Sequence, residues 1–370
     1  MGDAVATKQT IWPLEPHTAA KHQLLAQYLD AWFPILASFN KRVVFLDGFA
    51  GPGIYEGGEP GSPTIALSRL LDHPNFARMH GTTFDFVFNE QDVHRFQSLK
   101  TQVAAVQSGR NPWPRNVRIQ TVNQSFTTLG ERMLTGLEGK ALPPTFAFID
   151  PFGFKDAPLD LIQRLVKFRR IELFVYFPYN NVNRFSTAET LADPHLEALF
   201  GTDEFKNAPK GGAGSRKQFL HDLYQRQLQD VCGFDYVQSF EMVNADNHTG
   251  YFLFFCTRDL TGFDRMKTAM WKVDPAGGRR FTDVLAGQTV LFQEDVDTSP
   301  LRSELLAHFA GKTVSIKEVT DFVVGKTPFI SSHVKRKTLA PMQADGLIEC
   351  PGQKTRGQYP DGTLIRFPDA

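Results

Sequence analysis

The sequence predicts an α/β protein with a mostly parallel central sheet, followed by a smaller C-terminal domain. Three observations lead to this prediction. Short apolar runs such as Val43–Leu46 alternate with amphipathic segments of helical spacing, which is typical of strands buried on both faces of a parallel sheet. The first of these runs leads directly into a glycine-rich turn, Asp47–Gly53. From about residue 299 the pattern changes to short helices followed by a basic turn.

The composition is that of an ordinary globular protein. The chain has 370 residues, of which 42% are hydrophobic, and its 40 Lys and Arg balance 40 Asp and Glu. A net charge of zero gives no global electrostatic argument for nucleic acid binding, so any such argument must be local. A chain of this length is expected to form two or three domains.

The cysteines and the hydropathy pattern predict a cytoplasmic protein without a metal site. Cys232, Cys256 and Cys350 are far apart and have neither metal-ligand spacing nor the spacing of a disulfide framework, which fits a reducing compartment. The first ten residues are polar, and no stretch approaches the ~18 apolar residues of a membrane span. We therefore expect a soluble intracellular protein.

Asp47 and the glycines that follow the first strand predict a ligand pocket. Glycines there allow the backbone to approach a ligand, at the carboxyl end of the first strand of an open α/β sheet. The glycines fall at positions 48, 51 and 53, an order that does not match the dinucleotide fingerprint G-x-G-x-x-G and so disfavours a nicotinamide cofactor. An acid at this turn would attract an ammonium group and repel a phosphate. The alternative is a tight turn with no ligand.

The turn D-G-F-A-G-P-G resembles motif I of the class I S-adenosylmethionine-dependent methyltransferases. In that family this loop passes the methionine part of the cofactor, where the acid can pair with the cofactor's ammonium. The resemblance implies that the methionine end of the cofactor is held by Asp47, Gly48, Phe49, Gly51 and Gly53.

The ends of the next two strands predict the rest of the cofactor site. The strand at 84–90 ends in Glu90, whose carboxylate is placed to accept hydrogen bonds from both ribose hydroxyls. The strand at 117–122 leads into Asn123, Ser125 and Phe126, which we expect to contact the adenine. The alternatives are an ordinary strand-end acid at Glu90 and a turn with a buried phenylalanine at Phe126.

A second motif, Asp150-Pro151-Phe152-Gly153, ends the buried strand at 145–149. It resembles the D-P-P-[YF] motif of amino-group methyltransferases that act on nucleic-acid bases. An exocyclic amine is a poor nucleophile because its lone pair is delocalised into the ring, and an acceptor at Asp150 draws the amine towards sp³ geometry. The backbone at Pro151 supplies a second acceptor, and either Phe152 or Phe154 is placed to stack on the base. Phe152 stands where the family has its second proline. This departure weakens the prediction of an amine substrate more than the prediction of the fold. The alternative is a strand-ending turn.

Other segments have structural interpretations. A helix is expected from a cap at Thr18 to about Phe39, with Lys21 and His22 in a solvated first turn or, alternatively, at the edge of the cleft. The segment 55–63 is expected to be flexible, with Ser62 as the N-cap of the next helix. Residues 210–217 are expected to form a mobile basic loop that is solvated or, alternatively, contacts phosphates. The segments 234–242 and 251–257 are predicted to be antiparallel strands that close the sheet.

The C-terminal segment predicts a winged-helix-like domain. Helices are expected at 301–309, 315–324 and 328–345, followed by strands at 347–350 and 363–367 that flank a basic turn. A helix in the major groove with a basic wing on the backbone is a common mode of nucleic acid binding. The predicted nucleic-acid contacts are His333, Lys335, Arg336 and Lys337 on the third helix and Lys354 and Arg356 in the wing. The alternative is a protein-docking unit.

Taken together, Lys21-His22, the turn at 47–53, G-E-P-G-S-P at 58–63 and F-I-D-P-F-G at 148–153 closely resemble the three-Cys-motif partner family of bacteria. The resemblance extends over nearly the whole chain, including the C-terminal tail. The pattern along the chain predicts an N-terminal arm and helix (1–40), a methyltransferase-like Rossmann domain (41–298) and a winged-helix-like domain (299–370). The resemblance also implies a partner protein that bears a three-cysteine motif.

Two functions follow as hypotheses. The leading hypothesis is an S-adenosylmethionine-dependent methyltransferase that acts on an exocyclic amine of a DNA or RNA base. The alternative is a non-catalytic methyltransferase-like scaffold that binds the three-cysteine-motif protein and nucleic acid.

Overall fold

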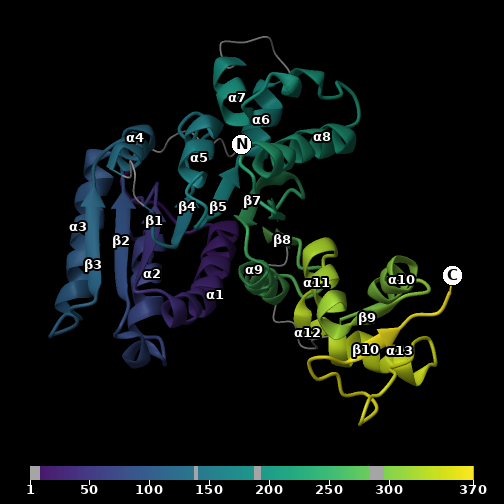
Figure 1. The fold of residues 1–370 in the computed structure, drawn as a ribbon. Helices are drawn as coiled ribbons and strands as arrows, with labels where there is room; N and C mark the ends of the chain where they lie inside the picture. The colour runs from purple at the N-terminus through teal and green to yellow at the C-terminus, as the bar shows by residue number, and fades with distance from the viewer. Residues whose placement is uncertain (1–8, 137–140, 187–192, 284–295, 370) are drawn as a thin grey trace. The chain divides into compact units, whose positions relative to one another are not determined.

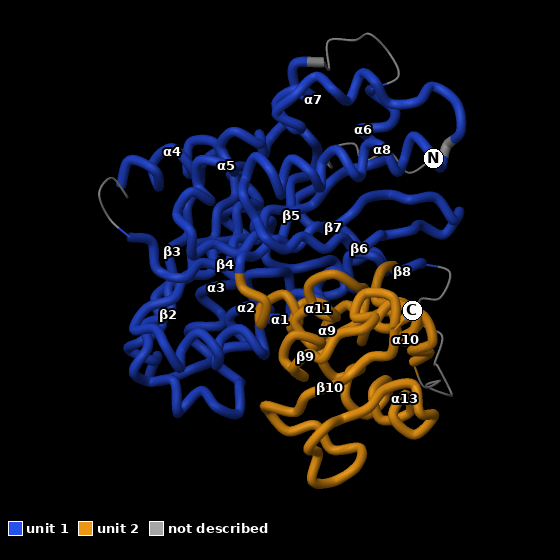
Figure 2. Tube along the Cα trace, turned by 45° about the vertical axis from the view of Figure 1, so that its right-hand side comes forward, with its two compact units in different colours: residues 1–258, 281–286 blue, residues 259–280, 287–370 orange. Residues whose placement is uncertain are grey.

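The computed structural model describes residues 9–136, 141–186, 193–283 and 296–369. The chain divides into two compact units, which Figure 2 colours separately. The first unit comprises residues 1–258 and 281–286, and the second comprises residues 259–280 and 287–370. The second unit thus includes a helix, α9 (Leu260–Val273), that lies outside the expected domain at 299–370.

The first unit is built on a mixed sheet with the strand order β3-β2-β1-β4-β5-β7-β6-β8 (Figure 1). Its strands are β1 (Arg42–Asp47), β2 (Thr83–Asn89), β3 (Val117–Val122), β4 (Thr145–Ile149), β5 (Ile171–Phe177), β6 (Tyr236–Val243), β7 (Thr249–Thr257) and β8 (Arg280–Thr282). Neighbouring strands from β3 to β5 pair in parallel, whereas β7 pairs antiparallel with both β5 and β6. The predicted α/β class, with a mostly parallel sheet and an antiparallel pair at its close, is confirmed.

Helices cover both faces of this sheet, as Figure 2 shows for the first unit. One layer contains α1 (Pro16–Phe39), α2 (Ser62–Leu71) and α3 (Val93–Ser108). The other layer contains α4 (Phe126–Gly136), α5 (Leu159–Val166), α6 (Tyr179–Phe185), α7 (Asp193–Phe200) and α8 (Ala213–Arg226). The segment after β5 forms α6, and α1 begins two residues before the predicted cap at Thr18.

A layer of phenylalanine rings lies between the sheet and α1. Residues two apart on a strand share one face, and β2 accordingly places Phe84, Phe86 and Phe88 together. Phe146 on β4 stacks on Phe45 of β1 at a centroid distance of 5.8 Å. Tyr28 and Trp32 of α1 pack on Phe146 from the helix side. Many of the chain's 33 phenylalanines are therefore core residues.

The helix α1 contains an internal proline that the tertiary structure accommodates. Pro34 has no N–H, so the carbonyl of Asp30, four residues earlier, has no helical donor. The side chain of His73 lies with Nε2 3.0 Å from that carbonyl oxygen and replaces the missing donor. This hydrogen bond joins α1 to the segment that follows α2.

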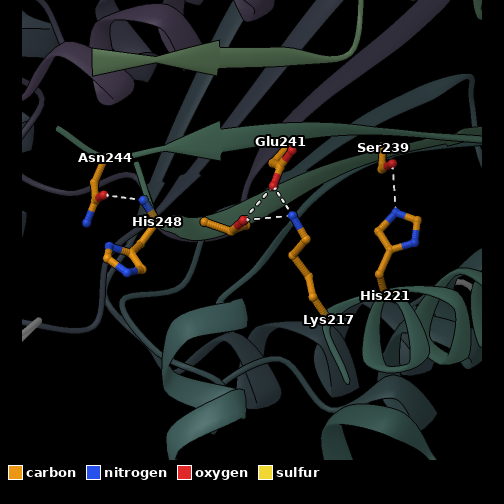
Figure 3. A network of polar contacts seen from close by, with 7 residues as sticks. Lys217, His221, Ser239, Glu241, Asn244 and His248 are labelled. Carbon is orange, nitrogen blue, oxygen red and sulfur yellow. Dashed lines mark hydrogen bonds and ion pairs between the residues drawn. The ribbon is translucent and has the colours of Figure 1, made fainter. Parts of the chain in front are cut away.

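The predicted basic loop at 210–217 is wrong in its second half, because α8 begins at Ala213. Arg216 is buried and donates to the carbonyl oxygens of Ala208 and Pro209, both at 3.1 Å. Lys217 donates to Glu241 Oε1 of β6 at 2.7 Å, within the polar network shown in Figure 3. Side chains that the sequence indicated as solvated thus attach α8 to the rest of the first unit.

The second unit has a small apolar core of its own. In chain order its elements are α9, α10 (Ser299–His308), β9 (Thr313–Ser315), α11 (Ile316–Lys326), α12 (Ser331–His333), a π-helical segment at Val334–Leu339, α13 (Ala340–Ala344) and β10 (Leu364–Arg366). The strand β9 pairs antiparallel with β10. The predicted strand at 347–350 contributes a single bridge, between Glu349 and Arg366.

The predicted helix at 328–345 is interrupted. Pro341 removes the donor to the carbonyl of Lys337, and Thr298 Oγ1 donates to that oxygen instead, at 2.9 Å. The backbone ahead of the proline is π-helical over Val334–Leu339.

Candidate functional site

A pocket of about 180 Å³ lies at the carboxyl edge of the sheet in the first unit. It is lined by the glycine-rich turn after β1, the motif after β4, tyrosines of β5 and β7, and the N-terminal part of α1. The lining residues are Trp12, His17, Thr18, Lys21, His22, Phe49, Ala50, Gly51, Pro52, Gly53, Ile54, Tyr55, Gly61, Ser62, Asp150, Pro151, Phe152, Tyr176 and Tyr251. The pocket therefore joins three of the predicted cofactor residues to the three predicted catalytic residues.

The glycine-rich turn packs against the G-E-P-G-S-P segment. Gly61 N donates to the carbonyl of Gly53 at 2.9 Å, and Ile54 forms a bridge with Pro60. A Cβ on Gly61 would lie 2.9 Å from the carbonyl carbon of Gly53, so no side chain fits there. Residues 54–61 thus form a hairpin that supports the turn, and the flexibility predicted for residues 55–63 stays a prediction.

Asp47 is fully buried, and its carboxylate is hydrogen-bonded to neighbouring protein groups. It accepts hydrogen bonds from Ser62 Oγ at 2.6 Å and from Phe49 N at 3.1 Å. Burial raises the pKa of Asp47 to about 7 despite these donors, and the nearby carboxylates of Asp150 and Glu90 add to the increase. Ser62 is consequently not the predicted N-cap of α2, which is Gly61. At neutral pH the carboxyl group carries only part of a negative charge.

Glu90 supports the glycine-rich turn from the end of β2. Its carboxylate accepts from Gly51 N at 3.0 Å and from Asp92 N at 2.7 Å, and burial raises its pKa. Asn123, at the end of β3, donates to the carbonyl oxygens of Glu90 and Gln91 at 2.7 and 2.9 Å. Neither side chain lines the pocket, and their contacts to a cofactor stay predictions.

Ser125 and Phe126 also have structural partners. Ser125 Oγ accepts from Thr128 N at 3.1 Å at the start of α4. The ring of Phe126 is buried against Phe49, with a centroid distance of 5.2 Å. It also lies over Gly48, where a Cβ would be 2.9 Å from the ring and is therefore excluded. Their predicted contacts to adenine remain untested.

Lys21 forms an ion pair with Asp150 inside the pocket. The lysine side chain is 9% exposed, and its Nζ lies 6.0 Å from the ring centroids of both Tyr176 and Tyr251. The favoured interpretation of a solvated helix start is wrong. Lys21 shares a helical face with Leu24, Leu25 and Tyr28, and this spacing is the signal that predicts its burial.

Phe152 and Trp12 form an aromatic group at the pocket. Phe152 is 40% exposed and contacts Trp12 edge to face at a centroid distance of 5.4 Å. The guanidinium of Arg95, from α3, lies 4.4 Å from the ring centroid of Phe152. The sequence did not indicate Trp12 or Arg95, because their positions depend on the packing of the N-terminal segment and of α3.

His22 is buried beside Lys21 and contacts the ring of Tyr55 at a centroid distance of 5.5 Å. Burial, with a smaller contribution from the positive charge of Lys21, lowers the pKa of His22 to about 3. The imidazole is therefore neutral in the folded protein down to acidic pH.

This burial predicts a pH-dependent loss of stability. In the unfolded chain His22 takes up a proton below about pH 6.5, whereas the folded protein does not take it up until about pH 3. Stability is therefore lost as the pH falls below 6.5, by at most about 1.4 kcal/mol per pH unit. In urea unfolding between about pH 6.5 and pH 4, we expect the free energy of unfolding of a His22→Gln variant to rise relative to that of the wild type. The expected rise is at most about 1.4 kcal/mol for each unit by which the pH falls. A pH-independent difference would contradict the assignment.

The predicted nucleic-acid contacts of the second unit have different environments. His333 is buried against Trp271 at a centroid distance of 4.7 Å, and burial lowers its pKa to about 4, so it is not available at the surface. Arg356 donates to the carbonyl of Gln343 at 2.8 Å, near the end of α13. Arg336, Lys337 and Lys354 are exposed, and Lys335 is partly exposed.

The described residues contain neither a metal-binding cluster nor a membrane-spanning helix. Within them, no cluster of three or more His, Cys, Asp or Glu is arranged to hold a metal ion. None of the helices in the described part of the chain has the length and apolar character needed to cross a membrane.

Comparison with known proteins defines no family for this chain. No protein-family model matches it, and none of the curated proteins does. Among solved structures, the METTL16 MTase domain is similar over 62% of this chain and 66% of that chain, with 11% sequence identity and a TM-score of 0.27. A similarity at this level defines no activity or substrate, so the functional interpretation depends on the pocket.

Proposed function

We propose that this protein is an S-adenosylmethionine-dependent methyltransferase whose acceptor is an exocyclic amine of a nucleic-acid base. One observation carries the proposal: a single pocket joins the glycine-rich turn after β1 to Asp150, Pro151 and Phe152 after β4. Because β1 and β4 are neighbouring parallel strands, their carboxyl ends lie side by side, where open α/β sheets bind ligands. The antiparallel pair β6 and β7 closes the sheet as the resemblance to class I methyltransferases implies.

The residues at the turn fit the cofactor. Gly51 has a φ of +62°, and the nearest atom to a Cβ built there belongs to Trp12, at 3.9 Å. The backbone at Gly51 thus borders open space in which a ligand can approach it closely. Asp47 lies beneath the turn and does not line the pocket, so its partial negative charge would favour the cofactor's ammonium through the turn and not by direct contact. When bound, S-adenosylmethionine supplies a methyl group on a positively charged sulfur.

The pocket side chains would position the acceptor. Asp150 would accept a hydrogen bond from the amine, and the exposed face of Phe152 would stack on the base. Catalysis in this scheme is mainly positioning of the two reactants in line. The helix order of the second unit and the exposed Arg336, Lys337 and Lys354 support a winged-helix-like domain that binds nucleic acid.

A second candidate function is the non-catalytic scaffold that binds a three-cysteine-motif protein. It is favoured by the ion pair of Asp150 with Lys21, which fills the position where an acceptor amine would bind. Membership of the three-Cys-motif partner family and the existence of that partner are part of this proposal.

The test is calorimetric titration of S-adenosylmethionine and S-adenosylhomocysteine into the wild type and two glycine variants. Gly51→Ala places a methyl group in the pocket and is expected to weaken binding at least about tenfold, which corresponds to about 1.4 kcal/mol. Gly58→Ala is the matched control, because Gly58 also has a positive φ, of +89°, and open space, yet does not line the pocket. Both variants should be destabilised similarly by backbone strain.

Equal affinity in both variants would contradict the assigned cofactor position. Absence of binding to the wild type would overturn the methyltransferase proposal and favour the scaffold. Binding is followed by tritium-transfer assays on DNA and RNA. Binding without transfer to any nucleic acid, with or without a co-expressed partner, would also favour the scaffold.

A further inference from the structure

The surroundings of Lys21 define a small subsite within the pocket. Its ammonium is paired with Asp150 and lies at equal distances from the rings of Tyr176 on β5 and Tyr251 on β7. The two rings are themselves in contact, with centroids 4.6 Å apart. The hydroxyl of Tyr251 donates to the carbonyl of His17 at 3.3 Å, which helps to fix its ring.

A carboxylate combined with aromatic faces is a chemical environment that binds an ammonium ion. The carboxylate supplies the opposite charge, and the negative faces of the rings attract the cation, more strongly when water is excluded. Lys21 shows that this subsite accepts such a group, since both its side chain and that of Asp150 are largely buried, at 9% and 19% exposure.

We propose that Asp150, Tyr176 and Tyr251 form the subsite that binds the acceptor nitrogen, and that Lys21 occupies it until the acceptor displaces its ammonium. This inference rests on the proposed methyltransferase function. During transfer the lone pair of the acceptor nitrogen forms the new bond to the methyl carbon, and the carbon–sulfur bond breaks with its electrons moving to the sulfur. The nitrogen gains positive charge and afterwards releases a proton to solvent. Asp150 and the two ring faces stabilise that developing charge.

The first experiment tests the subsite without knowledge of the acceptor. Lys21→Ala removes three methylene groups beyond Cβ together with the ammonium, a set of atoms that n-propylammonium replaces. We expect millimolar n-propylammonium to raise the melting temperature of Lys21→Ala, with no matching increase for the wild type. The neutral isostere 1-propanol should have no effect. A further loss of the response in Lys21→Ala with Asp150→Asn would assign the binding to this carboxylate.

An equal response to 1-propanol would overturn the inference, because it would show a cavity that is merely apolar. An equal response of the wild type would overturn it as well, since the subsite is then not the one that Lys21 fills. Lys21→Met keeps the volume of the side chain and removes its charge, so it leaves no space for n-propylammonium. It carries the kinetic test below, which decides the inference if Lys21→Ala does not fold.

The second experiment measures transfer kinetics. Lys21→Met should lower KM for the nucleic-acid acceptor by at least about threefold, because no ammonium then competes for Asp150, and should leave the dissociation constant of S-adenosylmethionine unchanged. Tyr251→Leu should lower kcat, whereas Tyr251→Phe, which keeps the ring face, should largely retain it. An unchanged or raised KM in Lys21→Met would overturn the inference. If the wild type transfers no methyl group, the proposed function fails, and the n-propylammonium titration still decides the subsite.

Discussion

Replacement of Asp150 by asparagine is expected to lower the rate of methyl transfer by at least about 100-fold while leaving the affinity for S-adenosylmethionine nearly unchanged. The carboxylate lines the pocket, and in the proposed function its charge would offset positive charge on the attacking nitrogen. Asparagine keeps the size of the side chain but not the charge. The measurement is single-turnover transfer of a tritiated methyl group, with cofactor affinity determined in parallel by calorimetry.

This substitution also leaves the ammonium of Lys21 without its carboxylate partner. Breaking a buried ion pair on one side typically costs about 3–5 kcal/mol, and the partial exposure of Asp150 should reduce that cost. The double variant Lys21→Met with Asp150→Asn is therefore the control. It should recover stability without recovering transfer. Recovery of transfer together with stability, or loss of cofactor binding in the single variant, would mean that Asp150 is structural.

Replacement of Glu172 by alanine is expected to lower the free energy of unfolding of the first unit by about 3–5 kcal/mol, because buried donors lose their acceptor. Glu172 lies on β5, where its carboxylate accepts from Tyr28 Oη at 2.8 Å and Trp32 Nε1 at 2.6 Å, both on α1. It also accepts from Thr257 Oγ1 of β7 at 3.0 Å. All three donor side chains are buried, whereas Glu172 is partly exposed, so a water molecule at the vacated carboxylate position is the route by which the loss can be reduced.

The measurement is urea unfolding followed by tryptophan fluorescence, to which Trp32 contributes together with Trp12, Trp113 and Trp271. Glu172→Gln, which keeps one acceptor oxygen, should lose clearly less stability than Glu172→Ala. The second control is Glu131→Ala, which removes the exposed ion pair with Arg164 and should hardly change the midpoint. Equal losses in the Glu172 and Glu131 variants would show that the hydrogen bonds to α1 contribute little.

The sequence by itself was sufficient for the fold class, for the strands β1 to β7 in their order along the chain and for the position of the glycine-rich turn. These features depend on local periodicity and on residues with special backbone behaviour, which neighbours in sequence largely determine. The apolar runs at β1, β4 and β5 and the positive φ of Gly51 and Gly53 are examples. The pairing of the two motifs in one pocket was also predictable, since the carboxyl ends of parallel strands meet at one edge.

Only the tertiary structure decided which polar side chains are buried and what they contact. Lys21 reaches Asp150 across 129 positions of sequence, and Ser62 Oγ turns towards Asp47 instead of capping α2. The sequence indicated His333 and Arg216 as surface cations, but both side chains are buried. Burial lowers the pKa of His333, and Arg216 donates to a backbone carbonyl. In each case the deciding partner lies on another element, so the free energy of burial depends on contacts that no local pattern contains.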